Sequence, residues 1–184
     1  MNSFFAHFLT ITKHRRLVRQ GCFKVGLYWQ GITHDLSKYS PTEYLIGVKY
    51  YQGNRSPNNA EREDKGYSEA WLHHKGRNRH HYEYWVDYSS RKGPGWIPVP
   101  MPNRFIAEMF MDRIAACRVY QKDAYTNASP LEYYESGKTP EIMHEYTRKR
   151  LYFLLRMLAE RGEDETFRYI REVFLKKRRK AGKR

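Results

Sequence analysis

The sequence predicts an all-α protein. Apolar residues recur at helical spacing along nearly the whole chain, and no run alternates apolar and polar residues for long enough to indicate a strand. A length of 184 residues is enough to bury one core without disulfides or structural metals. We therefore expect one helical domain over residues 1–175, followed by a basic tail at 176–184.

Three helices are predicted in the first part of the chain. The first covers about residues 2–20 and the second about 22–36. A third begins after Ser40, the expected N-cap, and ends near Gly53. Glu43 is predicted to complete a capping box with Ser40. One face of the first helix carries four residues at helical spacing: His7, Ile11, His14 and Val18.

The middle of the chain is predicted to be less regular. Residues 53–66 are rich in Asn, Gly and charged residues, and we expect them to form an exposed loop. A helical stretch follows over 67–90, in which Gly76 and Asn78 are candidate breaks. Residues 91–102 contain four prolines and are expected to cross irregularly between helices.

Helical periodicity returns in the last part of the chain. One helix is predicted over residues 103–122. Two amphipathic helices follow over about 140–161 and 164–178, with Gly162 between them. These two are expected as C-terminal additions to the main bundle.

The positive charge of the chain is concentrated at its end. Net charge is +14, and residues 176–184 hold seven Lys and Arg with no acid, which is half of the excess. Such a run is typical of a solvated extension, or of an arm that binds nucleic acid. Neither Cys22 nor Cys117 has a second cysteine nearby, so no zinc ribbon or disulfide framework is indicated. Without a secretory leader or a membrane-length apolar run, we expect a cytoplasmic protein with no membrane partner.

Histidines are clustered in a way that indicates a metal site. Five of the eight histidines come from two short segments: His34, His73, His74, His80 and His81. Imidazole is the commonest nitrogen ligand of transition metals. Asp35, directly after His34, offers a carboxylate ligand of different hardness, and this combination suits a site with more than one cation.

Asp112 gives an independent argument for a buried cation. It lies within an apolar stripe formed by Phe105, Met109, Ala116 and Val119. A carboxylate on a buried face must find a cation, donors or a proton, because its desolvation is costly. Arg113 or Arg118 could serve, although neither faces the same way, and a metal shared with His34 and Asp35 is the alternative. His14, alone on the apolar side of its helix, is weaker evidence.

The order of these residues resembles the HD-domain superfamily of metal-dependent phosphohydrolases. "HDLSK" is similar to the HDxGK variant of the HD-GYP cyclic dinucleotide phosphodiesterases, with Ser37 in place of glycine. "HHKGRNRHHYEYW" resembles the later histidine stretch, and "MDRIAACRVYQKDAYTNASPLEYY" the aspartate helix, but the GYP element is missing. "HDLSK" with "NxHHxEYW" also resembles a small family of uncharacterised bacterial and phage proteins. The resemblance covers about residues 10–135.

This resemblance implies an HD-like helical bundle with a binuclear centre. His14, His34, Asp35 and Asp112 match the core ligands of the superfamily. His74 and one or both of His80 and His81 match the extra histidines, and His73 would flank them. Two divalent ions, from among Mn, Fe, Ni, Co and Zn, would be bridged by Asp35 and would activate water.

The expected activity is hydrolysis of a nucleotide or another small phosphate ester. Asp35, Lys38 and Glu83 are the candidate catalytic residues, Glu83 as an acid or as a partner of a ligand histidine. Lys38, Arg77 and Arg79 are the candidate groups for binding the substrate phosphate. Two alternatives stay open: a di-iron oxygenase of the HD fold, and a non-enzymatic helical protein that binds nucleic acid through its tail.

Overall fold

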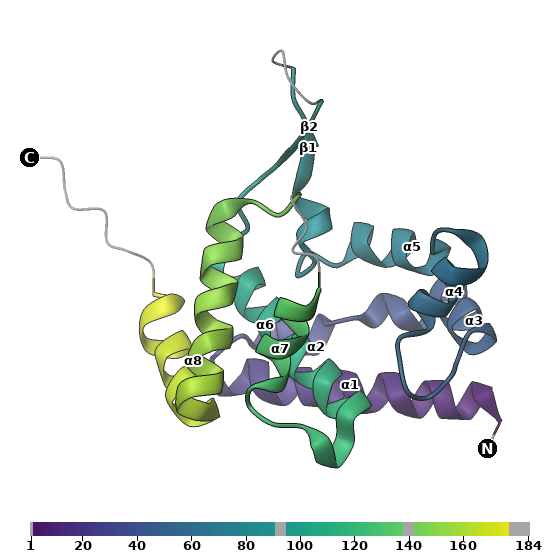
Figure 1. The fold of residues 1–184 in the computed structure, drawn as a ribbon, viewed down its shortest axis with the longest axis horizontal. Helices are drawn as coiled ribbons and strands as arrows, with labels where there is room; N and C mark the ends of the chain where they lie inside the picture. Colours follow the sequence, from purple (N-terminus) through teal and green to yellow (C-terminus); the bar gives the residue numbers. More distant parts are fainter. Residues whose placement is uncertain (1, 91–94, 138–141, 177–184) are drawn as a thin grey trace, which may run out of the picture.

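The computed structural model is a bundle of helices that carries one small β-hairpin (Figure 1), which confirms the all-α prediction. It describes residues 2–90, 95–137 and 142–176. The long helices α1 (Ser3–Lys24) and α6 (Asn103–Gln121) pack against each other through the buried core. The helices α3 to α5 gather at the N-terminal end of α1, and α8 lies toward its other end.

The first break in the chain comes later than predicted. Residues 21 and 22 belong to α1, and the chain turns at Gly26, whose φ is +83°. The second helix is therefore only α2 (Tyr28–Thr33), and the prediction of one helix over 22–36 is wrong. Gly21 lies within α1, where the helix approaches α6 so closely that an added Cβ would lie 2.8 Å from Sδ of Met111, so the glycine is there for packing and does not end the helix.

The segment after α2 forms η1 (Leu36–Tyr39) and α3 (Pro41–Lys49). Ser40 is the N-cap, as predicted, and its side chain accepts a hydrogen bond from the Glu43 amide. The capping-box prediction is wrong in its second half, because the Glu43 carboxylate contacts two histidines instead of the start of its own helix.

The loop predicted over 53–66 contains a helix, α4 (Pro57–Lys65), which corrects that prediction. Its ends carry ordinary signals, with Ser56 and proline at the start and Gly66 at φ +81° at the end. The buried Glu61 fixes the next turn, because its Oε2 accepts a 2.6 Å hydrogen bond from Ser68. Charged residues on the outer face of this short helix hide its periodicity in the sequence.

The helix predicted over 67–90 is shorter, and a hairpin follows it. Helix α5 (Glu69–Arg77) ends at Asn78, one of the two candidate breaks, whereas Gly76 stays helical. The turn η2 (Tyr82–Trp85) then leads into β1 (Val86–Tyr88), which pairs antiparallel with β2 (Trp96–Pro98). The sequence did not indicate these two strands, because three-residue strands are too short to show alternation.

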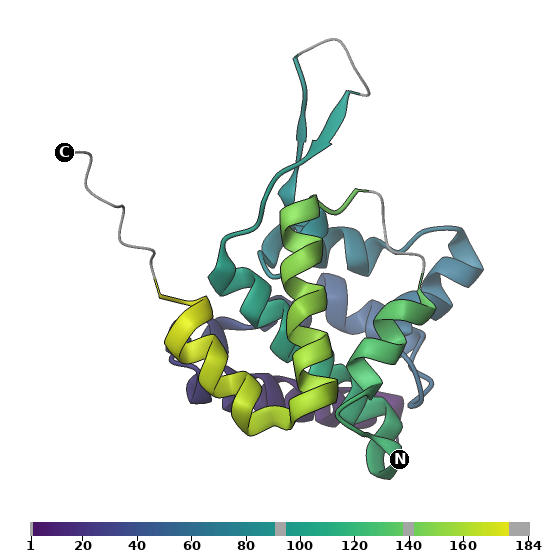
Figure 2. The same cartoon turned by 60° about the vertical axis from the view of Figure 1, so that its left-hand side comes forward.

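The C-terminal helices pack against α6. After η3 (Lys122–Ala124) and α7 (Ser129–Ser136), α8 (Glu145–Tyr169) changes direction at Gly162, where φ is +77° (Figure 2). A π-helical turn, η4 (Ile170–Phe174), completes the described chain in this region. The predicted break at Gly162 is confirmed. Both predicted helices are shorter than expected, because residues 142–144 and 175–176 are not helical, and residues 140–141 and 177–178 lie outside the described residues.

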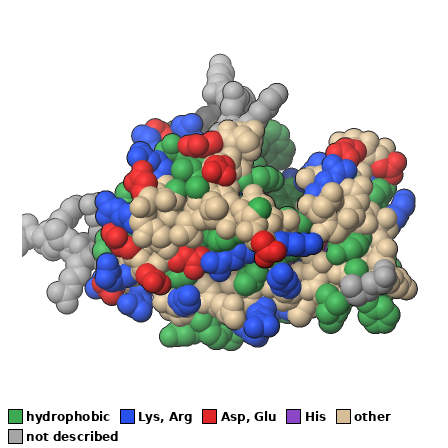
Figure 3. Space-filling model, turned by 60° about the horizontal axis from the view of Figure 1, so that its bottom comes forward, with side chains coloured by type: hydrophobic (Ala, Val, Ile, Leu, Met, Phe, Trp, Pro, Cys, Tyr) green, Lys and Arg blue, Asp and Glu red, His purple; other side chains and the backbone are tan. Residues whose placement is uncertain are grey.

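The exterior gives no sign of a membrane-spanning segment. Across the described ranges, every helix is too short or too polar to cross a bilayer. On the face shown in Figure 3, Lys and Arg side chains alternate with Asp and Glu instead of forming one basic area. The predicted nucleic-acid arm at 176–184 lies outside the described residues except for Lys176.

Gly47 of α3 is expected to be intolerant of a side chain. A Cβ there would lie 2.2 Å from Nε2 of His7, which is buried and stands beside the rings of Tyr44 and Tyr51. We expect Gly47→Ala to lower the free energy of unfolding by about 1–3 kcal/mol, because His7 would have to leave its packed position beside the rings of Tyr44 and Tyr51. The midpoint of urea unfolding measures the change.

Gly76→Ala is the matched control for this prediction. Gly76 is also helical, but an added Cβ there meets nothing within 4 Å. Alanine at that position is expected to raise stability by about 0.5–1 kcal/mol through helix propensity. A Gly47→Ala protein as stable as wild type would contradict the predicted clash, and the double variant with His7→Ala should recover most of the loss if His7 causes it.

Candidate metal centre

The backbone around Asp35 places two adjacent side chains in the protein interior. His34 ends α2, and Asp35 then takes the left-handed conformation, with φ +53° and ψ +26°, before η1 begins. Arg15 of α1 holds this junction, because its Nε donates a 2.7 Å hydrogen bond to the His34 carbonyl. The left-handed turn is rare outside glycine, but aspartate and asparagine tolerate it better than most residues. Both His34 and Asp35 are fully buried as a result.

One set of four ligand atoms gathers around one oxygen of Asp35. His14 Nε2 lies 3.6 Å and His34 Nε2 lies 3.4 Å from Asp35 Oδ2. Asp112 Oδ1 completes the set, 2.9 Å from His14 Nε2 and 3.6 Å from His34 Nε2. These residues come from α1, the end of α2 and α6, and each offers one atom within 4.8 Å of the others. We call this set the first ligand group.

A second set gathers around the other oxygen of the same carboxylate. His74 Nε2 lies 3.2 Å and His80 Nε2 lies 3.3 Å from Asp35 Oδ1. His81 Nε2 faces His74 Nε2 at 2.9 Å, and all four residues meet the same 4.8 Å condition. We call this set the second ligand group. Both His80 and His81 reach it because α5 ends at Asn78, before the chain turns back.

Two glutamates hold the ring nitrogens that face away from Asp35. Glu108 Oε1 lies 3.0 Å from His34 Nδ1 and 3.2 Å from His80 Nδ1. Glu43 Oε2 lies 2.7 Å from His74 Nδ1. An imidazole that donates Nδ1–H to a carboxylate presents the lone pair of Nε2 on its other side. The two glutamates therefore set three rings with Nε2 directed at Asp35.

Sequence reasoning missed both glutamates. Glu108 lies one turn before Asp112 on the same buried side of α6, so the argument made for Asp112 applies to it equally. Glu43 was assigned to a capping box, which gave its side chain another partner. His73, expected to flank the ligands, does so by a 2.6 Å contact between its Nδ1 and Glu43 Oε1.

The chemistry of this cluster suits a metal ion. Burial by itself would raise the pKa of Asp35. The nearby His34, Lys38 and His74 nevertheless hold this pKa well below its ordinary range, so the carboxylate is charged. Apart from the 2.6 Å ion pair between its Oδ2 and Lys38 Nζ, neither of its buried oxygens has a hydrogen-bond partner in the described part of the chain. Burial, with His80 and His74 beside it, lowers the pKa of His81 well below its ordinary value. The charge of Asp35, with carboxylates on the far side of each ring, raises the pKa of His34 and His74 above the ordinary value despite their burial, so a bound cation would displace protons from these two imidazoles.

The alternative partners of Asp112 are engaged elsewhere. Arg118 forms an ion pair with Glu163 of α8, and the Arg113 guanidinium lies over the ring of Tyr134. Asp112 is directed at His14 and His34, and hydrogen bonds from them hold its pKa well below its ordinary range against the effect of burial. The explanation of Asp112 by an arginine on its own helix is therefore wrong.

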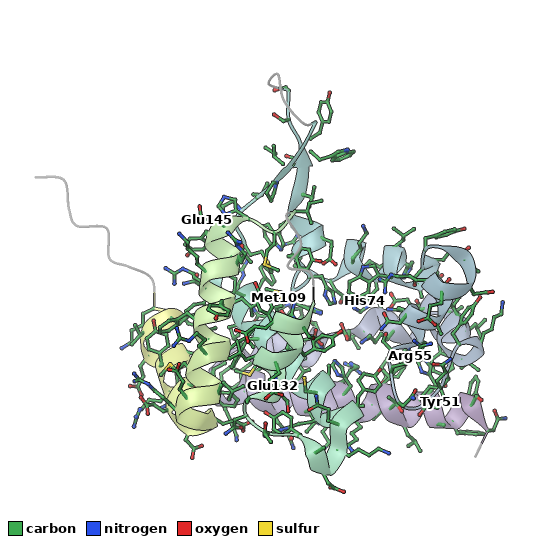
Figure 4. The ribbon with its side chains drawn as sticks, viewed as in Figure 1. Tyr51, Arg55, His74, Met109, Glu132 and Glu145 are labelled. Carbon is green, nitrogen blue, oxygen red and sulfur yellow. The ribbon has the colours of Figure 1, made fainter. Side chains whose placement is uncertain are left out.

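A cavity of about 610 Å³ reaches the cluster from outside. His14, His74, His81 and Asp112 line it, and so does Lys38, whose Nζ lies 2.6 Å from Asp35 Oδ2. In Figure 4 the labelled His74, Met109 and Arg55 mark three of its sides, on α5, on α6 and between α3 and α4. The volume is typical of a site for a small molecule.

Three residues chosen from the sequence lie away from the ligand groups. Arg77 and Arg79 are exposed, contact the His73 carbonyl and the Tyr84 hydroxyl respectively, and do not line the cavity. Glu83 does line it, but no hydrogen bond or ion pair joins it to a ligand histidine in the described structure, and the Nδ1 atoms of His34, His80 and His74 are held by Glu108 and Glu43. Burial raises the pKa of Glu83 above its ordinary value.

Comparison with known families covers most of the chain. Residues 3–157 match a family described as a family of unknown function, DUF5662. The chain belongs to the DUF5662 family. The match includes every residue of both ligand groups, so the cluster lies within the part that defines this DUF5662 protein. No curated protein and no solved structure matches it.

Proposed function

We propose that this DUF5662 protein is a metal-dependent phosphohydrolase that acts on a nucleotide or another small phosphate ester. The observation that carries the proposal is that one buried carboxylate belongs to two ligand groups, with a different oxygen of Asp35 facing each group. A cavity large enough for a small ester lies against both groups. Two adjacent cation sites beside a ligand cavity are typical of phosphate ester hydrolysis.

The ligand groups divide the work of the site. The first would hold one ion through His14, His34, Asp35 and Asp112, and the second another through Asp35, His74, His80 and His81. Bound divalent ions supply Lewis acidity toward a phosphoryl oxygen and lower the pKa of water. Glu108 and Glu43 keep the imidazoles in the tautomer that presents Nε2, so the protein fixes the donor atoms before an ion arrives.

Lys38 is the group placed to act on the substrate. It lies in η1, one turn beyond Asp35, and its ammonium lines the cavity while paired with the shared carboxylate. With Asp35 engaged by cations, the Lys38 ammonium would be free to bind a phosphate oxygen and to stabilise negative charge that develops there. Lys38 would therefore bind and polarise the phosphate, and the residues of the two ligand groups would position the cations.

One observation favours a second function. The two groups together contain five imidazoles and only two carboxylates, a donor set that suits iron as well as the other candidate metals. A di-iron oxygenase of the HD fold would use the same residues. The metal that the protein carries therefore bears directly on the choice between the two activities.

Elemental analysis and an ester panel test the proposal together. Protein purified without a metal-binding tag or added metal is expected to contain about two transition-metal ions per chain. Phosphomonoesters and phosphodiesters are then supplied with Mn, Fe, Co, Ni or Zn, and at least one is expected to be hydrolysed in a chelator-sensitive way. Lys38→Gln should keep the ions but lose about 10²-fold in kcat, whereas Lys13→Gln, on the exposed side of α1, should change neither.

The possible outcomes separate the alternatives. Two bound iron ions with no hydrolysis of any ester would reject the phosphohydrolase and favour the oxygenase. A folded protein that takes up no metal, even after reconstitution, would reject both enzymes. The nucleic-acid-binding alternative would then remain, and it predicts salt-dependent binding that is lost when the basic tail is removed.

A further inference from the structure

Helix α1 buries one of its sides and leaves the other exposed. The buried side lines the cavity of the metal centre, and His14 belongs to it. On the exposed side, Phe5, Leu9, Arg16 and Phe23 recur at i, i+4, i+11 and i+18, so they form one stripe along the helix. This stripe is about 27 Å long, since each helical residue adds about 1.5 Å. Three of its four side chains are large and apolar, whereas the solvent side of a helix is ordinarily polar.

The chain that follows α1 runs back beside this stripe. Three contacts join the two segments along their length: Phe23 with Tyr28 at 5.3 Å between ring centroids, Arg15 Nη2 with the Ile32 carbonyl at 3.1 Å, and the hydroxyls of Thr12 and Tyr39 at 3.0 Å. Helix α2 and η1 therefore lie against α1 in the opposite direction. They expose three more large apolar side chains: Trp29, Ile32 and Leu36. We call these six apolar residues, together with Lys13, Arg16 and Arg19, the α1–α2 face.

The α1–α2 face carries positive charge and no acid. Residues 2–60 contain only two acids, Asp35 and Glu43, and both are buried among the histidines of the metal centre. Lys13, Arg16 and Arg19 are all exposed. In Figure 3, where the side of α1 is turned forward, hydrophobic and Lys or Arg side chains adjoin along the lower edge, and the acids seen elsewhere in the view do not extend to it. A partner of this face must therefore be both apolar and anionic.

The composition of the face distinguishes between the partners that carry negative charge. A second copy of the chain presenting the same face would bring like charges together. Nucleic acid supplies phosphates and stacks its bases on aromatic rings, but it offers no apolar partner to Leu9, Ile32 and Leu36. An anionic bilayer supplies both parts, because its acyl region accepts aliphatic and aromatic side chains alike and its headgroups attract Lys and Arg.

We propose that the α1–α2 face docks on a lipid bilayer with an anionic surface, with α1 lying in the plane of the membrane. The sequence argues against a membrane partner only through its lack of a spanning segment, which a helix lying in the interface does not need. The cavity of the metal centre is lined by the opposite side of α1, so docking leaves both ligand groups uncovered. The proposal is therefore independent of the reaction at the metal centre.

Flotation with lipid vesicles tests the apolar part of the face on the full-length protein. The probes are vesicles of phosphatidylcholine alone and vesicles that also contain about one third phosphatidylglycerol, and binding to the second is expected to be at least about tenfold tighter. Leu9→Ser should weaken that binding by about tenfold. Leu72→Ser on α5 is the matched control, because Leu72 is 52% exposed and Leu9 is 54% exposed, and it should change nothing.

A second pair of variants separates the face from the overall positive charge of the chain. Replacing both Arg16 and Arg19 by Gln should weaken binding to the anionic vesicles by about tenfold. Replacing both Arg148 and Arg168 by Gln removes the same charge from exposed positions of α8, and binding should stay within about twofold. An unchanged midpoint of urea unfolding checks that each variant is folded.

Tryptophan quenching tests whether the face enters the bilayer. Brominated phosphatidylglycerol quenches tryptophans that reach the apolar region. Trp29 on α2 is 74% exposed and Trp96 on β2 is 65% exposed, but only Trp29 belongs to the α1–α2 face. Trp29→Phe should therefore remove most of the quenching, whereas Trp96→Phe should leave it. Phenylalanine keeps an apolar ring at each position, so binding itself is retained.

Four outcomes would overturn the proposal. One is a wild-type protein that binds neither kind of vesicle. Another is vesicle binding that persists in Leu9→Ser and in the Arg16 and Arg19 double variant without quenching of Trp29, which would assign binding to the basic tail. Without vesicle binding, self-association that is lost in Leu9→Ser would assign the face to a second copy. Binding of a single-stranded oligonucleotide that is lost in the same variants would assign it to nucleic acid.

Discussion

Replacing Asp35 by asparagine is expected to empty both cation sites at once. Each oxygen of this carboxylate faces a different ligand group, so loss of its charge removes a donor from both. We expect the metal content to fall from about two ions per chain to nearly none, and turnover to fall by about 10³-fold or more. Elemental analysis and single-ester kinetics on the same samples measure the two effects.

Asparagine is the informative substitution because it also tolerates the left-handed backbone. Asp35 has φ +53°, and a residue that cannot hold this conformation would disturb the end of α2 as well as the charge. Asp123→Asn is the matched control, since this carboxylate is exposed in η3 and contacts no ligand residue. An Asp35→Asn protein that keeps two ions and full activity would sink the proposed centre.

The second large effect is expected at Glu108. One of its oxygens accepts from Nδ1 of His34, in the first ligand group, and of His80, in the second. Glu108→Gln removes the negative charge that makes both imidazoles better donors, so affinity at both sites is expected to fall by about 10- to 100-fold. Competition of the protein with a chelator of known affinity measures the metal affinity of each site.

Glu43→Gln tests the other glutamate that holds a ligand histidine through its Nδ1, and its effect can be compared with that of Glu108→Gln. Glu43 supports His74, which belongs only to the second ligand group, so the weakening should be confined to one of the two ions. Glu132→Gln, at an exposed position of α7, should leave both ions unaffected. If Glu108→Gln and Glu132→Gln bind metal equally well, Glu108 is a packing residue and does not support the ligands.

The sequence predicts the long elements well and the short ones poorly. Helices α1 and α6 each repeat their apolar face over several turns, and the break at Gly162 has a strong local signal. Helix α4 and the hairpin escape prediction for different reasons. In α4 most residues are polar and only its ends identify it, whereas β1 and β2 are three residues long and are defined by their pairing with each other.

The candidate site divides in the same way. All seven predicted ligands lie close together in the structure. Asp112 and His14 are visible in the sequence as polar residues on apolar helix faces, whereas His74, His80 and His81 were chosen from the clustered histidines through the family resemblance. Arg77 and Arg79 were chosen because they are close to the histidines in the chain, yet they lie outside the cavity. Arg62 and Arg113 reach it through the packing of α4 and α6, and no local pattern reports that packing.

The left-handed backbone at Asp35 restricts which sequences can occupy this position. Glutamate would keep the charge, but its longer side chain is poorly suited to φ +53° and would move the carboxylate. Glycine and asparagine hold the conformation but carry no charge. Among these residues, only aspartate meets both the conformational and the charge requirement, so each of these substitutions at residue 35 is expected to be unfavourable. A family sequence that lacks aspartate here would not form the proposed metal centre in the arrangement described above.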